Sequence, residues 1–114
     1  MTRRGNVYVI DDDEAVRDSL HFLLDSADFD VSLFETAQKF LNALSTIEFG
    51  CVVSDVRMPG IDGMELLKRI KASRATLPVI IMTARDGDGA VVLGLRAGAD
   101  DYLVKPVRKA VLLA

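Results

Sequence analysis

The stretch CVVSDVRMPGIDG, residues 51–63, decides the fold class. Its apolar run Cys51–Val53 ends at Asp55, and a loop containing a Pro-Gly pair follows. Asp62 can then cap a helix, because apolar residues recur after it at the spacing of helical turns: Met64, Leu67 and Ile70. A buried strand that ends in a carboxylate and leads through a loop into an amphipathic helix is typical of one unit of a parallel α/β sheet.

Similar units lie on both sides of this stretch. Apolar or alternating runs typical of strands occur at residues 7–10, 29–33, 51–53, 78–82 and 101–104. Helical patterns separate them, at residues 16–27, 37–44, 64–70 and 89–97. This alternation predicts a single α/β domain with a parallel five-stranded sheet, right-handed crossovers and helices on both faces.

Length and composition exclude several classes of protein. A chain of 114 residues accommodates one domain, and 50% hydrophobic residues are enough for a packed core. The net charge of -3 does not favour binding of nucleic acid or an anionic membrane, and we predict neither for this domain. Apolar runs are too short for a membrane span. The lone Cys51 excludes an internal disulfide and suits a cytoplasmic protein.

Polar side chains follow the ends of four predicted strands. Asp11 and Asp12 follow the first strand, Asp55 the third, Thr83 the fourth and Lys105 the fifth. Because ligands of open parallel sheets bind at the carboxyl ends of the strands, we expect these residues to converge there. Adjacent carboxylates repel each other unless a cation holds them, and hard oxygen ligands suit Mg²⁺. A lysine and a hydroxyl opposite the metal suit a phosphoryl group, so the pattern predicts a Mg²⁺-dependent phosphoryl site with a carboxylate as nucleophile.

These motifs, in this order, resemble the receiver domain of response regulators, in the CheY-like superfamily. The resemblance rests on VIDD at residues 9–12, DVRMPGIDG at 55–63, Thr83-Ala84, and AGADDYLVKP at 97–106. It implies a flavodoxin-like sheet in the order 2-1-3-4-5, flanked by five helices. The whole of residues 1–114 is then one receiver domain. We expect it to be a fragment of a longer regulator, truncated just inside its last helix after Pro106.

The resemblance also assigns the chemistry. A histidine kinase or a phosphotransfer protein would donate a phosphoryl group from phosphohistidine to Asp55. Asp12, Asp55 and the backbone carbonyl of Arg57 would bind Mg²⁺ directly, and Asp11 would act through a metal-bound water. The domain would assist its own phosphorylation and dephosphorylation without being an enzyme with a separate substrate.

Further residues would bind the phosphoryl group and transmit the signal. Lys105, Thr83 and the backbone N–H of Ala84 would contact the phosphoryl oxygens. Thr83 and Tyr102 would move together on phosphorylation and alter the face formed by the fourth helix and fifth strand. That face would contact partners, including a second copy in a homodimer, and the signal would reach a transcriptional output domain.

Two subfamily resemblances coexist in the chain. Residues 9–17 and 54–60 are FixJ-like, whereas Thr83-Ala84-Arg85-Asp86 and residues 94–106 are OmpR-like. The FixJ group usually has Phe at the position of Tyr102, and the OmpR group usually has an aromatic residue at Val107. Natural, divergent and recombined origins of the chain all stay open on this pattern.

Two other functions fit parts of the sequence. A haloacid-dehalogenase-like phosphatase would use Asp11 as its nucleophile, although 114 residues are few for that fold. A receiver-shaped interaction module without phosphorylation is the other alternative, but such modules normally lack at least one of the acidic, Thr or Lys residues found here. Simpler roles are a helix cap for Asp13, solvent exposure for His21 and core packing for Cys51.

Overall fold

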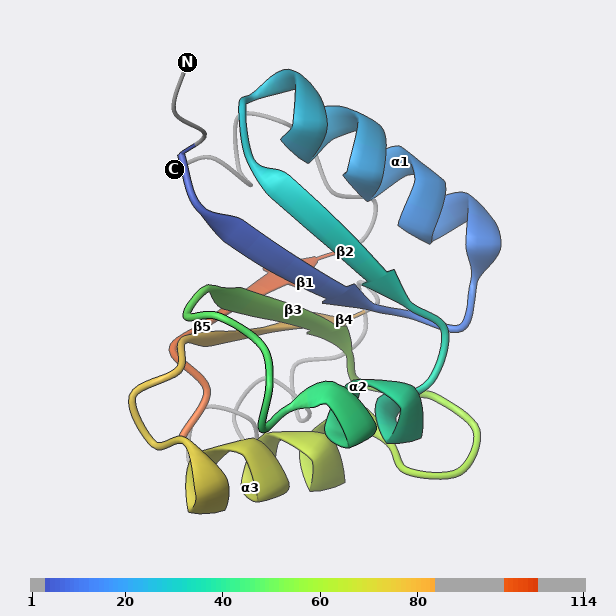
Figure 1. The fold of residues 1–114 in the computed structure, drawn as a ribbon. Coiled ribbons are helices and arrows are strands. Elements are labelled where there is room, and N and C mark those ends of the chain that lie inside the picture. Colours follow the sequence, from blue (N-terminus) through green and yellow to red (C-terminus); the bar gives the residue numbers. More distant parts are fainter. Residues whose placement is uncertain (1–3, 84–97, 105–114) are drawn as a thin grey trace.

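A parallel five-stranded sheet, in the order β2-β1-β3-β4-β5, forms the centre of the molecule in the computed structural model (Figure 1). The structure describes residues 4–83 and 98–104. The strands are β1 (Asn6–Ile10), β2 (Asp30–Phe34), β3 (Cys51–Asp55), β4 (Val79–Thr83) and β5 (Asp101–Val104). The helices within these residues are α1 (Glu14–Ser26), α2 (Ala37–Ala43) and α3 (Gly63–Ser73).

This arrangement confirms the predicted fold class and strand order. Each of the four neighbouring pairs of strands is parallel. The chain crosses from the β1–β2 side to β3 and continues to β4 and β5, so the strand order reverses at β1 and β3. The helices predicted at residues 89–97 and after Pro106 lie outside the described residues.

Each described helix begins at a residue whose side chain accepts hydrogen bonds from the first turn. Asp13 accepts from Ala15 and Val16, as the sequence predicted. Thr36 accepts from the backbone of Lys39, and Asp62 accepts from the N–H of Glu65. These bonds satisfy donors that the helix itself leaves open, so the helix starts are fixed by local sequence.

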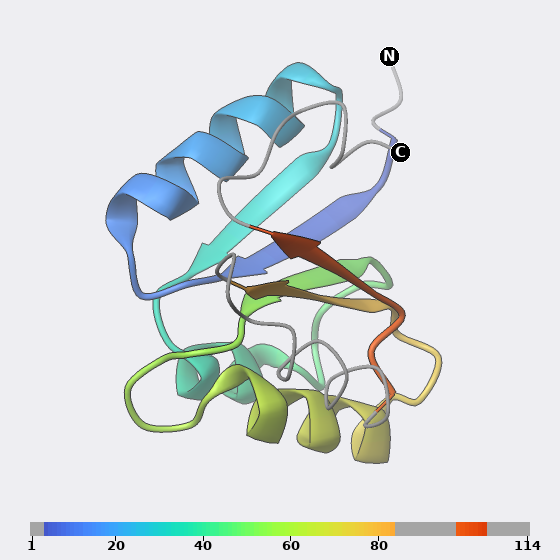
Figure 2. The same cartoon turned by 180° about the vertical axis from the view of Figure 1, so that it is seen from behind.

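Two hydrophobic clusters occupy the two faces of the sheet. Figures 1 and 2 show α1 over one face and α2 with α3 over the other. On the α1 side, Val7, Val9 and Val53 pack with Leu20 and Leu24. On the other side the cluster is larger and contains Ile10, Val52 and residues of α2 and α3, among them Phe40, Leu66, Leu67 and Ile70. Successive strand residues serve opposite faces, as expected for a sheet covered on both sides.

Two details of burial differ from the helical pattern read from the sequence. Leu66 is fully buried although the predicted face of α3 did not include it, and Met64 is only partly buried. The cause is that α3 packs on apolar residues of the sheet and also on α2, so its buried stripe is wider than a single row of residues. β2 forms one edge of the sheet, and Leu33, an apolar residue of its alternating sequence, is exposed. Of the helices described, none combines the length and apolar character needed to cross a bilayer.

Candidate functional site

Three aspartates meet at the carboxyl edge of the sheet. One carboxylate oxygen from each of Asp11, Asp12 and Asp55 lies within 4.8 Å of the others. Register explains the meeting, because β1 and β3 are neighbours and Ile10 pairs with Ser54. The residues that follow this pair, Asp11 and Asp55, are therefore side by side at the point where the strand order reverses. The structure confirms that the three predicted metal-binding carboxylates converge.

Asp11 is the most constrained of the three. It is fully buried, and its N–H donates to the carbonyl of Phe34 at the end of β2. Its Oδ1 accepts the N–H of Asp13 at 2.9 Å, and its backbone carbonyl accepts Nη1 of Arg17 at 2.7 Å. Asp12, between these anchored residues, is exposed. One carboxylate of the cluster is thus fixed in the protein interior, while a second faces solvent.

Asp55 is the last residue of β3 and is 8% exposed. The main chain around it is anchored on two sides. The hydroxyl of the buried Ser54 donates to the carbonyl of Asp55 at 3.1 Å, and the N–H of Val56 donates to the carbonyl of Met82 in β4 at 3.0 Å. Asp55 is therefore held at the edge of the cluster by its own strand and by the neighbouring strand.

The chemistry of this donor set suits a hard divalent cation. All three side chains offer carboxylate oxygens, and close negative charges favour a bound cation over three ionised groups alone. The exposed Asp12 leaves the cluster open to water, which Mg²⁺ retains in its coordination shell. The residues present therefore fit Mg²⁺.

The other predicted site residues are only partly within the described chain. Thr83 is the last residue of β4 and is buried. Tyr102 lies in β5, pairs with Ile81 and is 42% exposed, so it occupies the neighbouring strand two positions before the level of Thr83. Arg57 is exposed, two residues beyond Asp55. Ala84 and Lys105 lie outside the described residues, as does the proposed contact face of the fourth helix.

Comparison with known families agrees with this geometry. The model of the response regulator receiver domain matches residues 7–114. This chain belongs to the response regulator receiver family. Its described sheet order and its cluster of three aspartates are thus those of a two-component signalling domain.

The most informative relatives are transcriptional regulators. The chain is 58% identical to the transcriptional regulatory protein FixJ of Bradyrhizobium diazoefficiens over 106 residues, which cover 93% of this chain and 52% of that protein. It is 43% identical to the DNA-binding transcriptional regulator NtrC of Klebsiella pneumoniae, over 91% of this chain and 22% of the relative. The chain therefore spans about half the length, or less, of these curated relatives.

Solved structures give the same result. Full-length FixJ from B. japonicum superposes with a TM-score of 0.92 at 55% identity, covering 98% of this chain and 55% of that one. The BeF₃-activated DrrB receiver domain superposes with a TM-score of 0.85 at 34% identity, covering 99% of this chain and 92% of that one. The predicted receiver fold and FixJ-like resemblance are confirmed.

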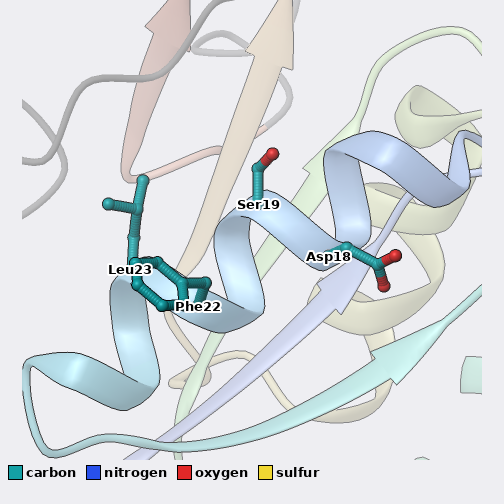
Figure 3. A pocket seen from close by; sticks show the side chains of 4 residues that line it. All are labelled: Asp18, Ser19, Phe22 and Leu23. Atoms are coloured by element: carbon teal, nitrogen blue, oxygen red, sulfur yellow. The ribbon is translucent and has the colours of Figure 1, made fainter.

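A surface pocket lies on α1, and its lining residues do not include Asp11, Asp12 or Asp55. Asp18, Ser19, Phe22 and Leu23 line it, and Phe22 is 73% exposed (Figure 3). The apolar residues that recur at helical spacing within residues 16–27 include Leu23 and leave out Phe22. Apolar spacing also gave no sign of the hydrogen bonds that Arg17 and Ser54 donate to the main chain of the site, because it carries no information on polar side chains.

Proposed function

We propose that this receiver domain accepts a phosphoryl group on the carboxylate of Asp55. The observation that carries the proposal is the meeting of Asp11, Asp12 and Asp55 within 4.8 Å, at the edge where the strand order reverses. Asp55 is the acceptor because it ends the central strand β3 and its main chain is anchored on both sides. A fixed nucleophile keeps the geometry needed for in-line attack.

The donor is phosphohistidine on a histidine kinase or a phosphotransfer protein. A carboxylate oxygen of Asp55 attacks phosphorus, the bond between phosphorus and the imidazole nitrogen breaks, and its electron pair stays on the departing imidazole. Hydrolysis of the resulting acyl phosphate regenerates the carboxylate and releases inorganic phosphate. The domain thus assists its own phosphorylation and dephosphorylation, and it needs no other substrate.

Asp12, Asp55 and the backbone carbonyl of Arg57 would hold Mg²⁺, with Asp11 acting through a water molecule. When bound, the ion supplies positive charge that offsets the carboxylates and the phosphoryl oxygens. The chain's own contribution is to fix the ligands: Asp11 is held by Asp13, Arg17 and the end of β2. Among the three carboxylates, Asp12 is the one most open to solvent.

Signal transmission would start at Thr83. Its hydroxyl, the N–H of Ala84 and the ammonium of Lys105 would bind the phosphoryl oxygens. Thr83 and Tyr102 would then change position together, and the partly exposed Tyr102 would alter the face that β5 shares with the fourth helix. We propose that this face binds partners, including a second copy of the chain, and that the switch controls a transcriptional output in the cytoplasm.

Phosphorylation with a small donor tests the proposal. Incubating the protein with acetyl phosphate and Mg²⁺ should add the mass of one phosphoryl group, and chelating the metal should prevent it. Asp55→Asn should abolish the addition. Asp18→Asn is the matched control, because it removes one exposed carboxylate from α1 and should leave the addition unchanged.

The alternative acceptor is tested by Asp11→Asn. A phosphatase of the haloacid dehalogenase type would turn over a phosphate monoester in wild type and in Asp55→Asn, and would lose that turnover in Asp11→Asn. A mass addition that persists in Asp55→Asn would overturn the proposal. Sedimentation velocity before and after beryllofluoride addition would report whether modification promotes a dimer.

A further inference from the structure

The first residue of α3 lies directly against the main chain of Asp55. A Cβ atom built on Gly63 would lie 2.1 Å from the carbonyl oxygen of Asp55 and 2.9 Å from its carbonyl carbon. It would also lie 2.9 Å from the Cα of Val56. The backbone of Gly63 is not in the left-handed region, so its conformation suits any residue. Glycine is needed here for space alone, because the atoms it approaches are backbone atoms that no rotamer change can move.

Two hydrogen bonds extend this contact to the peptide groups that follow Asp55. The N–H of Val56 donates to Met82 of β4 at 3.0 Å, and the carbonyl of Val56 accepts the N–H of Gly63 at 2.9 Å. The two consecutive peptide groups between Asp55 and Arg57 are therefore held from opposite sides, one by the sheet and one by α3. The hydroxyl of Ser54 adds a third anchor at the carbonyl of Asp55.

We infer that Gly63 is a positioning residue of the phosphorylation site. By allowing the first turn of α3 to rest on the carbonyl of Asp55, it sets the position of the acceptor carboxylate and of the Arg57 carbonyl relative to Asp11 and Asp12. This inference deepens the proposed function and rests on it. It predicts that a methyl group added at this contact weakens metal binding and slows phosphorylation even in protein that is fully folded.

A second glycine provides a matched control at the opposite edge of the sheet. A Cβ on Gly50, just before β3, would lie 2.5 Å from the carbonyl oxygen of Asn6 and 2.8 Å from its Cβ. Gly50 therefore meets a comparable obstruction, also involving backbone atoms, at the other end of the same strand. A methyl group there strains the sheet without touching the main chain of Asp55.

The experiment compares Gly63→Ala with Gly50→Ala. Both variants should lose stability in urea unfolding, because each methyl group overlaps backbone atoms. Gly63→Ala should in addition weaken Mg²⁺ binding by about tenfold or more, measured by calorimetry on the folded protein, and slow phosphorylation by acetyl phosphate even at saturating Mg²⁺. Gly50→Ala should keep both quantities within about twofold of wild type, as changes remote from a site do. Unchanged Mg²⁺ affinity in Gly63→Ala, or an equal loss in Gly50→Ala, would overturn the inference.

A measurement on the unmodified protein covers the case in which Gly63→Ala does not fold. In ¹⁵N-labelled wild type, the amide resonance of Gly63 should shift on addition of Mg²⁺ and again on addition of beryllofluoride, because its N–H is bonded to the segment that carries two of the proposed ligands. The Gly50 resonance should stay in place. An unmoved Gly63 resonance at saturating Mg²⁺ contradicts the inference.

Failure of the proposed function would look different. If wild type gains no phosphoryl group on Asp55 from any donor, the phosphoacceptor role is wrong. The Mg²⁺ affinities of the two glycine variants would still differ if Gly63 positions the aspartate cluster, so the two failures can be told apart.

Discussion

The two ends of the sheet differ in the arrangement of their charged side chains. At the carboxyl edge, Asp11, Asp12 and Asp55 bring three like charges within 4.8 Å. On the amino side, opposite charges and polar groups are matched: Nζ of Lys71 lies 3.0 Å from Oδ2 of Asp100. The same Asp100 oxygen accepts the N–H of Val79, where β4 begins.

This difference separates binding from stability within one small sheet. Like charges gathered at one edge oppose folding and favour a ligand of positive charge. At the other edge, Lys71 and Asp100 join the end of α3 to the starts of β4 and β5, and their opposite charges offset each other. Substitutions at the carboxyl edge should therefore change binding strongly, and substitutions at the amino edge should change stability with little effect on binding.

The largest effect should come from Asp12→Asn. It removes a proposed ligand and one of three mutually repelling charges. Mg²⁺ affinity should fall by about a hundredfold or more, because loss of a residue that only supports a metal ligand already costs up to about a hundredfold. The metal-free protein should become more stable, because the remaining carboxylates repel each other less. Calorimetry and urea unfolding measure the two quantities. Asp18→Asn is the control for loss of charge alone, and a variant that is less stable without metal would contradict the like-charge account.

The next largest effect concerns Cys51, at the amino end of β3. Burial, assisted by the negative charge of Asp100, raises the pKa of its thiol to about 11. At pH 8 the thiolate population should be about a hundredfold below that of a thiol at the ordinary value of 9.0, since each pKa unit is a factor of ten. Iodoacetamide should therefore alkylate native protein about a hundredfold more slowly than protein in urea.

The same pKa gives a direction for stability. Because the folded pKa exceeds the unfolded one, the contribution of this thiol is complete below pH 9 and disappears as the pH rises toward 11. Cys51→Ala should remove this part of the alkaline loss of stability. Equal alkylation rates in the native and unfolded states would show that the thiol is not shielded.

The third largest effect should come from Lys71→Met, which should lower the stability of the protein without changing its Mg²⁺ affinity. The Lys71 ammonium donates to the carbonyl of Leu77 at 2.8 Å as well as to Asp100, and its side chain is largely buried. Its loss leaves both acceptors without this donor and should cost about 2 kcal/mol in the free energy of unfolding. Mg²⁺ affinity should not change. Lys68→Met, on the exposed side of the same helix, is the control and should be close to neutral.

The positions of the strands and two helix starts could be predicted from short stretches of sequence. Apolar runs located the five strands, and Asp13 and Asp62 marked two of the helix starts because a capping side chain acts within three residues. The meeting of Asp11 with Asp55 was also predictable, since parallel strands bring their carboxyl ends to one edge.

The contacts between different elements of the fold were not predictable in this way. Gly63 against Asp55, Arg17 against the carbonyl of Asp11, and Lys71 with Asp100 all depend on how helices pack on the sheet. The last pair is separated by 29 residues, and no periodicity in the chain links the two. A glycine that is needed for space alone has the same sequence signal as a glycine in any loop before a helix.

The smallest effect should be the pH dependence that Asp100 contributes. Partial burial by itself raises the pKa of this carboxyl, but the N–H of Val79 at 2.7 Å and the Lys71 ammonium at 3.0 Å outweigh it, so the pKa lies below the ordinary 3.8. A lowered folded pKa adds stability above pH 3.8 that is lost as the pH falls through the folded value. Asp100→Asn should therefore be less stable than wild type at neutral pH by less than about 1 kcal/mol, because half of the side chain is exposed and solvent screens the pair. The gap should close below pH 3.8 in urea unfolding followed across pH. A gap that persists unchanged into that acid range would mean that Asp100 acts through its shape and hydrogen bonds, and that charge pairing does not distinguish the amino edge from the carboxyl edge.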